Sequence, residues 1–153
     1  MKRIGIVCLL LLPLLAPGIS QSTTQQAPQS TSSPVDLATL ERHLAEHRYQ
    51  ALIQLVEGST AQQDYPSQAY YYLAQAYRLR RHKGDDLLAA RAYRRAIRAA
   101  PDFALAYRDL GILQMKANRK KKSLKNLTTY LKLEPSAEDR FQIEQYIRLI
   151  SRR

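Results

Sequence analysis

Two histidines and a glutamate of this chain have the spacing of a zinc-peptidase motif. His43, Glu46 and His47 lie in the pentapeptide His-Leu-Ala-Glu-His, which matches the pattern H-x-x-E-H. A catalytic zinc needs three protein ligands and an open position, and this motif must lie on one continuous helix. The repeat spacing described below places His47 in a turn, before a helix that starts near Tyr49. We therefore interpret both histidines as surface residues and predict no metal site.

Other residue patterns that support catalysis do not occur in the sequence. It contains no nucleophile elbow, phosphate-binding loop or dinucleotide fingerprint, and its five glycines are scattered. Cys8 is the only cysteine, which excludes an intrachain disulfide and a cysteine-rich zinc module. We predict that the protein is not an enzyme and uses no cofactor, no metal and no small-molecule substrate.

The helices that carry the candidate residues follow an N-terminal leader. Lys2 and Arg3 precede the apolar stretch 4–15, and small residues follow it, which is the layout of a secretory signal peptide. We predict a signal peptide over 1–20 and export to the periplasm of a bacterium. The alternative is an uncleaved signal that anchors the chain in the inner membrane.

A polar segment separates the leader from the folded region. Residues 21–34, QSTTQQAPQSTSSP, carry no charge and almost no apolar side chains. Such a segment cannot bury enough surface to offset the entropy lost on ordering, so we predict a disordered linker. The folded domain is then 35–153, and the apolar fraction of 45% in the whole chain allows a packed core.

Self-similarity at a fixed period organises the rest of the chain. Pro101 and Pro135 are 34 residues apart, and the residues before each proline have matching spacing. The matched residues are Ala89, Tyr93 and Ala96 before the first proline, and Ser123, Leu127 and Tyr130 before the second. The preceding helices also match: Tyr70, Leu73, Ala74 and Tyr77 correspond to Tyr107, Leu110, Gly111 and Gln114. The offset there is 37 residues, so we expect the additional residues in a loop at 81–85.

This pattern resembles the tetratricopeptide repeat, whose signature is W-x2-L-G-x2-Y, then A-x3-F, then P, on a period of 34 residues. The matching residues are Tyr107 (in place of Trp), Leu110 and Gly111, and Ala89, Tyr93, Ala96 and Pro101. The resemblance implies an all-α fold, a short right-handed superhelical solenoid of antiparallel helix pairs. Small residues such as Gly111 would allow paired helices to approach closely.

We expect about seven helices, arranged as roughly three repeats and a C-terminal capping helix. The clear repeats are 67–103 and 104–137, and a degenerate repeat covers 33–66. A capping helix over 138–150, with Glu138 and Asp139 in its first turn, would cover the last repeat.

In the resembling family, the first helix of each pair lines a concave groove that holds a peptide or helix of a partner protein. Repeat spacing places ten residues there: Gln68, Tyr71, Tyr72, Gln75, Arg78, Leu105, Arg108, Ile112, Met115 and Lys116. Tyrosines anchor protein contacts well because they are large, fairly rigid and amphipathic, although part of this set is expected to serve packing. Acidic Glu41 and Asp109 occupy groove positions where carboxylate-clamp repeats carry Lys, Arg or Asn, so we do not expect a receptor for chaperone tails.

The formal net charge of +11 is concentrated in the two clear repeats. Segment 67–103 has eight basic and three acidic residues, and segment 104–137 has eight and two. The resemblance places the second helices on the convex surface, where a basic stripe could contact anionic material. Its residues are Arg91, Arg94, Arg95, Arg98, Lys121, Lys122, Lys125 and Lys132. The alternative is a solvated face that only keeps the protein soluble.

Two hypotheses of function follow. The first is a non-catalytic scaffold or adaptor in the cell envelope that binds a protein or peptide partner in the concave groove. The alternative is an envelope-associated protein that binds anionic lipid or polymer through the convex basic stripe. A third resembles the repeat tails of bacterial envelope metallopeptidases, here standing alone. We do not expect nucleic acid as a partner, because the leader directs the chain out of the cytoplasm.

Overall fold

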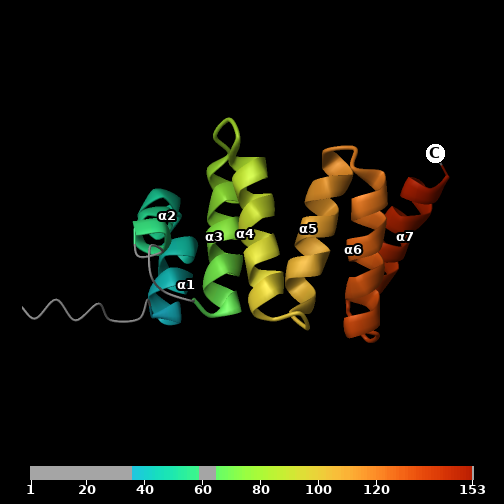
Figure 1. Cartoon of the computed structure of the whole chain (residues 1–153), viewed down its shortest axis with the longest axis horizontal. Coiled ribbons are helices and arrows are strands. Elements are labelled where there is room, and N and C mark those ends of the chain that lie inside the picture. Colours follow the sequence, from blue (N-terminus) through green and yellow to red (C-terminus); the bar gives the residue numbers. More distant parts are fainter. Residues whose placement is uncertain (1–35, 59–64, 153) are drawn as a thin grey trace, which may run out of the picture. The chain divides into compact units, whose positions relative to one another are not determined.

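The computed structural model describes residues 36–58 and 65–152, which all belong to the compact unit Ser33–Arg153. The predicted leader (1–20) and linker (21–34) lie outside the described residues. Within the described residues the chain forms seven α-helices and no strand, so the prediction of an all-α fold is confirmed (Figure 1). The helices are α1 (Leu37–Ala45), α2 (Tyr49–Gly58), α3 (Ser67–Arg80), α4 (Asp85–Ala99), α5 (Ala104–Lys116), α6 (Lys120–Leu133) and α7 (Arg140–Ser151).

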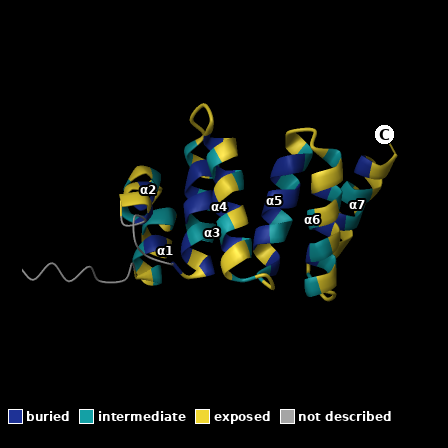
Figure 2. Ribbon diagram, viewed as in Figure 1, coloured by how far each residue is buried: buried dark blue, intermediate teal, exposed yellow. Residues whose placement is uncertain are grey.

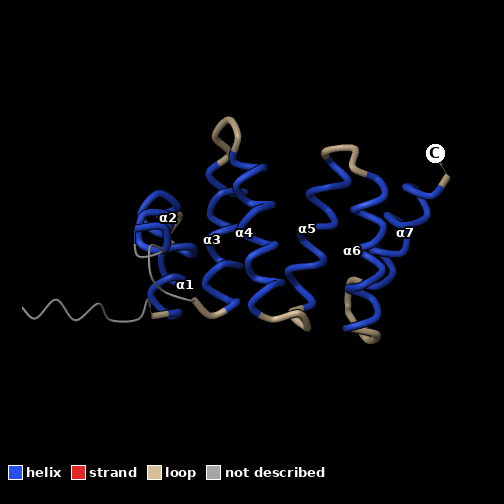
Figure 3. Tube along the Cα trace, in the orientation of Figure 1, coloured by secondary structure: helices blue, strands red, loops and turns tan. Residues whose placement is uncertain are grey.

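Successive helices pack side by side in chain order, from α1 and α2 to α7 (Figure 1). The most extensive contacts join α3 to α4 and α5 to α6, and α1 also packs against α3. Short loops join the helices of each of these pairs, which therefore run antiparallel (Figure 3). This arrangement confirms a solenoid of helix pairs like that of the tetratricopeptide repeat.

The same turn ends the first helix of two of the pairs, α1 and α5. His47 and Asn118 have φ angles of 58° and 55°, in the left-handed region that stops a helix. In both turns the next backbone N–H reaches back at 2.8 Å, from Arg48 to the His43 carbonyl and from Arg119 to the Gln114 carbonyl. Because α1 ends at Ala45 and His47 has a positive φ, the motif His43–His47 does not lie on one continuous helix, as the repeat spacing predicted.

The turn between α3 and α4 is one residue longer than the turns after α1 and α5, so it holds one of the three additional residues that we expected in the 81–85 loop; the other two lengthen α3 and α4. Arg81 ends α3 with φ 61°, and Gly84, with φ 90°, lies directly before α4. A positive φ is easily adopted by glycine, which explains why Gly84 is suited to this position.

Helix boundaries at the prolines agree with the sequence, but the start of the last helix does not. Helices α4 and α6 end before Pro101 and Pro135, respectively. Helix α7 begins at Arg140, whereas we expected it to begin at Glu138. The carboxylate of Asp139 does not cap α7; it instead contacts side chains of α5 and α6, so the acids precede the helix.

The core lies between the helices, and exposed residues lie on the outer faces (Figure 2). One buried cluster extends from α1 to α5, and a second joins α5, α6 and α7. The expected close approach occurs at Gly111, where an added Cβ would lie 2.7 Å from the Leu127 Cδ2 atom. The Ser123 hydroxyl donates a hydrogen bond to the Gly111 carbonyl at 2.8 Å, which fixes α6 against α5.

Candidate protein-interaction site

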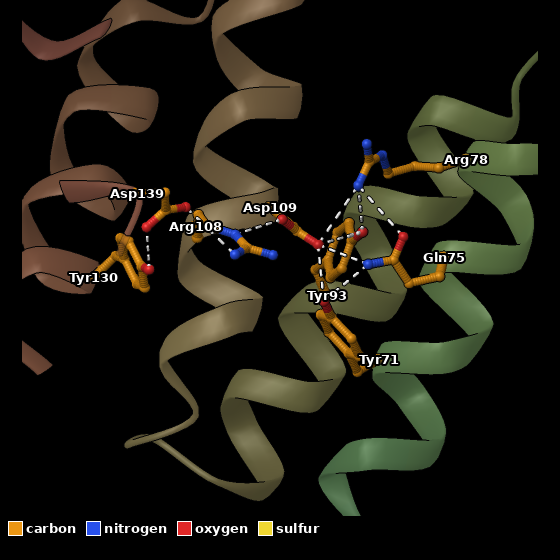
Figure 4. Close-up of polar contacts among 8 residues, drawn as sticks. All are labelled: Tyr71, Gln75, Arg78, Tyr93, Arg108, Asp109, Tyr130 and Asp139. Carbon is orange, nitrogen blue, oxygen red and sulfur yellow. Dashed lines mark hydrogen bonds and ion pairs between the residues drawn. The ribbon is translucent and has the colours of Figure 1, made fainter. Parts of the chain in front are cut away.

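A buried carboxylate joins two of the first helices. Asp109 of α5 is only 4% exposed, and its Oδ2 atom faces α3 (Figure 4). The Tyr71 hydroxyl donates to this oxygen at 3.0 Å, and the Gln75 side-chain amide donates to it at 2.8 Å. Both donors lie on α3, so a single acidic side chain of α5 organises the facing surface of its neighbour.

Two arginines and a second tyrosine complete this network. Arg108 Nε contacts the other carboxylate oxygen of Asp109 at 3.0 Å, and Arg78 Nη1 lies 3.5 Å from Oδ2. The Tyr93 hydroxyl of α4 lies 3.4 Å from the same oxygen. A charge removed from water is costly unless it is paired and hydrogen bonded, and here both carboxylate oxygens are satisfied.

Similar contacts lie on either side of the α3–α5 network, with α6 and the segment before α7 at one end and with α1 at the other. Arg108 also reaches Asp139 at 3.4 Å, and the Tyr130 hydroxyl donates to Asp139 (Figure 4). At the other end, the Tyr72 hydroxyl of α3 donates to Glu41 of α1. The links Glu41–Tyr72, Arg78–Asp109 and Arg108–Asp139 each join residues 31 positions apart. We name the residues of these contacts the carboxylate ladder: Glu41, Tyr71, Tyr72, Gln75, Arg78, Tyr93, Arg108, Asp109, Tyr130 and Asp139.

The ladder raises the pKa of its tyrosines above the ordinary value of 10. Burial, together with the charge of Asp109, raises the pKa of Tyr71 to about 12. Burial and the hydrogen bond to Glu41 raise the pKa of Tyr72 to about 12, and burial and Asp139 do the same for Tyr130. Burial alone would lower the pKa of Arg108, but the adjacent Asp109 raises it. The tyrosines therefore act as hydrogen-bond donors, and Arg108 stays a cation.

The structure brings half of the ten predicted groove residues into the ladder and leaves the others on the surface. The ladder members are Tyr71, Tyr72, Gln75, Arg78 and Arg108, all half-buried. Gln68, Leu105 and Lys116 are exposed. Ile112 and Met115 are half-buried and pack against the cluster of α5, α6 and α7. None of the ten is fully buried, so all of them contribute to the surface of the first helices, which we call the first-helix face.

Sequence reasoning missed the residue on which this face depends. Asp109 was read as a groove acid that excludes a carboxylate clamp, but it is buried and accepts hydrogen bonds. The repeat spacing did contain a signal, because Asp109 lies 37 positions after Tyr72 and so occupies the equivalent place in the next first helix. An acid at a position that holds a half-buried tyrosine in the preceding repeat suggests a paired carboxylate.

A pocket of about 580 Å³ opens at one end of the first-helix face, beside the α3–α4 turn. Three predicted groove residues line it, namely Arg78, Ile112 and Lys116. The remaining lining residues are Leu79, Arg81, His82, Lys83, Gly84, Asp86 and Leu113. Its cations and apolar side chains suit a segment that carries both acidic and apolar groups.

The predicted basic stripe lies on α4 and α6, away from the ladder. Seven of its eight residues are exposed; Arg95 is half-buried and its guanidinium lies 5.4 Å from the centre of the Tyr70 ring. Within residues 36–58 and 65–152, none of the eight forms an ion pair. The stripe is therefore a separate surface, which is treated below.

The described residues offer neither a metal site nor a membrane-spanning helix. No group of three or more His, Cys, Asp or Glu side chains among them is placed to hold a metal ion. None of the described helices has the length and apolar character needed to cross a bilayer.

Comparison with known proteins identifies the fold. No family model matches the sequence, and no curated protein matches it either. Among solved structures, the chain is similar to MamA, a protein that contains tetratricopeptide repeats, with a TM-score of 0.61 and 20% sequence identity. The match covers 76% of this chain and 63% of the MamA chain, so this chain spans less than two thirds of MamA. At this level of identity the similarity supports the tetratricopeptide-like fold.

Proposed function

We propose that this protein is a non-catalytic scaffold that binds a peptide or helix of a partner protein on its first-helix face. The fold supports the general role, since tetratricopeptide-like solenoids typically bind other proteins. The observation that carries the proposal is the carboxylate ladder, which holds polar and aromatic groups of α3 and α5 in fixed positions around Asp109. A pre-organised surface loses less entropy on binding, so more of the contact energy appears as affinity.

The open part of the face has the composition of a recognition surface. Leu105 of α5 is 38% exposed and adds an apolar side chain to this part of the face. Gln68 lies exposed on α3, and Lys116 ends α5 beside the pocket. Apolar and polar groups at the start of these helices and a hollow rimmed by cations at their other end favour a partner segment of mixed apolar and acidic character.

We propose the cell envelope as the site of this activity. The support is the leader-like sequence of residues 1–20, with its two basic residues and apolar stretch. Cleavage would release the scaffold into the periplasm, and retention of the segment would anchor it in the inner membrane. Mass spectrometry of the mature N-terminus distinguishes these two states, and a chain that stays in the cytoplasm would contradict both.

The ladder determines which substitutions can test binding. Tyr71 and Arg108 hold helices together, so their replacement would disturb the fold as well as the surface. The exposed residues Leu105 and Lys116 are better probes, because they support no described hydrogen bond or ion pair.

The experiment compares two double variants for capture of the native partner from envelope extracts. Leu105→Glu with Lys116→Glu alters the first-helix face, and Thr128→Glu with Lys132→Glu makes the same charge change on exposed positions of α6. We expect the first pair to lose the partner and the second to retain it, with equal helicity by circular dichroism. Equal capture by both pairs would overturn the proposed binding face.

A further inference from the structure

A second hollow lies between α4, α5 and α6, mostly on the second helices of the pairs. It has a volume of about 510 Å³, and four of its lining residues are cations: Arg94 of α4, Arg119 of the α5–α6 turn, and Lys122 and Lys125 of α6. Its other lining residues are Ile97, Tyr107, Leu110, Gln114, Asn126 and Thr129. We call this hollow the cationic cleft.

The cationic cleft contains no acidic residue. In the part of the chain that the structure describes, none of its four cations forms an ion pair. On the first-helix face, by contrast, Arg78 and Arg108 both form ion pairs with Asp109. Like charges held within one hollow repel each other, and a bound anion relieves that repulsion.

The floor of the cleft is ordered and supplies hydrogen-bonding groups. The Asn126 side-chain amide donates to Gln114 at 2.8 Å, which orients both side chains. The Tyr107 hydroxyl has no hydrogen-bond partner among the described residues and can donate to a ligand oxygen. The N-terminal end of α6, beginning at Lys120, adds partial positive charge next to Arg119.

An exposed leucine lies beside these cations. Leu87 of α4 is 63% exposed, the second most exposed large apolar side chain after Phe141 in the described chain. It lines a small hollow that shares Arg94 and Arg119 with the cationic cleft. Cations that contact phosphates, next to an apolar side chain that can enter the acyl boundary, are the combination that membrane-surface binding requires.

We propose that the cationic cleft binds the phosphate groups of an anionic phospholipid surface, with Leu87 inserted at the edge of the hydrocarbon. The cationic cleft shares no lining residue with the pocket on the first-helix face, whereas the small hollow of Leu87 shares Asp86 and Leu113 with that pocket. A soluble anionic polymer would use the same cations but would gain nothing from Leu87, and that difference separates the two ligands.

The test measures co-sedimentation with vesicles of phosphatidylglycerol and phosphatidylcholine, compared with phosphatidylcholine alone. The protein is used as it is isolated from cells, because any leader contributes equally to every variant. We expect binding that requires phosphatidylglycerol and weakens with salt. The triple variant Arg94→Glu, Lys122→Glu, Lys125→Glu should lose about a hundredfold in affinity, since each surface cation is worth about a fivefold change.

The matched control is Arg42→Glu, Arg148→Glu, Arg152→Glu, which makes the same charge change at exposed positions. Arg42 lies on α1, Arg148 on α7, and Arg152 directly after α7. It should bind within a few-fold of the unaltered chain. Leu87→Ser should weaken vesicle binding and leave binding of soluble polyphosphate unchanged. Equal losses for both triple variants, no preference for phosphatidylglycerol, or an unaltered vesicle affinity for Leu87→Ser would each overturn the proposal.

Discussion

The Tyr71 hydroxyl of α3 donates a hydrogen bond of 3.0 Å to the buried Asp109 carboxylate of α5. This contact joins two helices that are separated along the chain by α4. Arg78 and Gln75 reach the same carboxylate from α3, so the first-helix face is tied together by its own polar groups. Residues that a repeat pattern assigns to ligand binding thus also hold the solenoid together.

Replacement of Asp109 by asparagine tests this role. Asp109→Asn keeps the size of the side chain but leaves Arg78 without an anion and Arg108 with Asp139 alone. We expect the free energy of unfolding to fall by about 3 kcal/mol, the lower end for breaking a buried pair, because both arginines are partly exposed. Urea denaturation measures the change. The control Asp102→Asn alters an exposed turn residue and should change stability by less than about 0.5 kcal/mol. Equal stability of the two variants would contradict the ladder.

Close packing at Gly111 leads to the second prediction. Gly111→Ala places a methyl group 2.7 Å from the Leu127 side chain, so Leu127 must move or α5 and α6 must separate. We expect a loss of about 1–3 kcal/mol in thermal or urea unfolding. Gly58→Ala is the matched control, since no atom lies within 4 Å of the new methyl group and alanine favours helix. A neutral Gly111→Ala would show that the helices do not approach this closely.

The buried pair of Arg80 and Asp85 predicts a pH dependence of stability. Arg80 contacts both oxygens of Asp85, at 3.0 and 2.6 Å, and the His82 backbone N–H adds a third donor at 2.8 Å. The hydrogen bond from Arg80 lowers the pKa of Asp85 below its ordinary value, although burial opposes this. Because the pKa of Asp85 is lower in the folded chain than in the unfolded chain, its carboxylate stabilises the fold at pH values above the unfolded-chain pKa, near 4. This stabilisation is lost as the pH falls through the pKa of the folded chain.

Asp85→Asn should therefore destabilise the protein by about 3 kcal/mol at neutral pH, and the deficit should shrink below about pH 4. Chemical denaturation at a series of pH values measures both quantities. Asp86→Asn, at the next and exposed position in the same helical turn, provides the control and should show a small difference. A deficit for Asp85→Asn that stays constant down to the most acidic pH would rule out the ion pair as its cause.

Alkaline titration of the tyrosine hydroxyls provides a further test of the carboxylate ladder. The pKa values of Tyr71, Tyr72 and Tyr130 are raised to about 12, mainly by burial. Because the folded pKa is raised, their contribution to stability is complete below about pH 10 and is lost as the pH rises through about 12. Tyrosinate absorbance should therefore appear in two phases, the later one accompanied by loss of helical circular dichroism. A single phase near pH 10 with the helices intact would contradict burial of these hydroxyls.

Sequence periodicity predicted the helices because the packing residues of a solenoid repeat in a fixed register. Small Gly111 and the prolines at 101 and 135 marked a close contact and two helix ends, and the structure has all three. The carboxylate ladder could not be predicted, since its hydrogen bonds depend on side-chain directions between helices that do not follow each other in the chain. The start of α7 was misplaced for the same reason, because Asp139 contacts Arg108 and Tyr130 and does not cap its own helix.

The cationic cleft, too, could be predicted from the sequence only in part. Arg94 followed from helical spacing, Lys125 from the repeat offset and Lys122 from the run of lysines before it, whereas Arg119, which precedes that run, was missed. Spacing along one helix also cannot show whether a cation has an acidic neighbour on another helix. The structure supplies that distinction between the paired arginines of the first-helix face and the unpaired cations of the cleft.

Site-specific photo-crosslinking in living cells tests the proposed scaffold most directly. A photoreactive residue at Leu105 would lie on the exposed part of the first-helix face, and one at Thr128 on the exposed part of α6. We predict that the probe at Leu105 gives one discrete protein adduct, which the Lys116→Glu substitution weakens, and that the probe at Thr128 does not give this adduct. The same adduct from both positions, or from Thr128 alone, would contradict the first-helix face as the protein-binding surface.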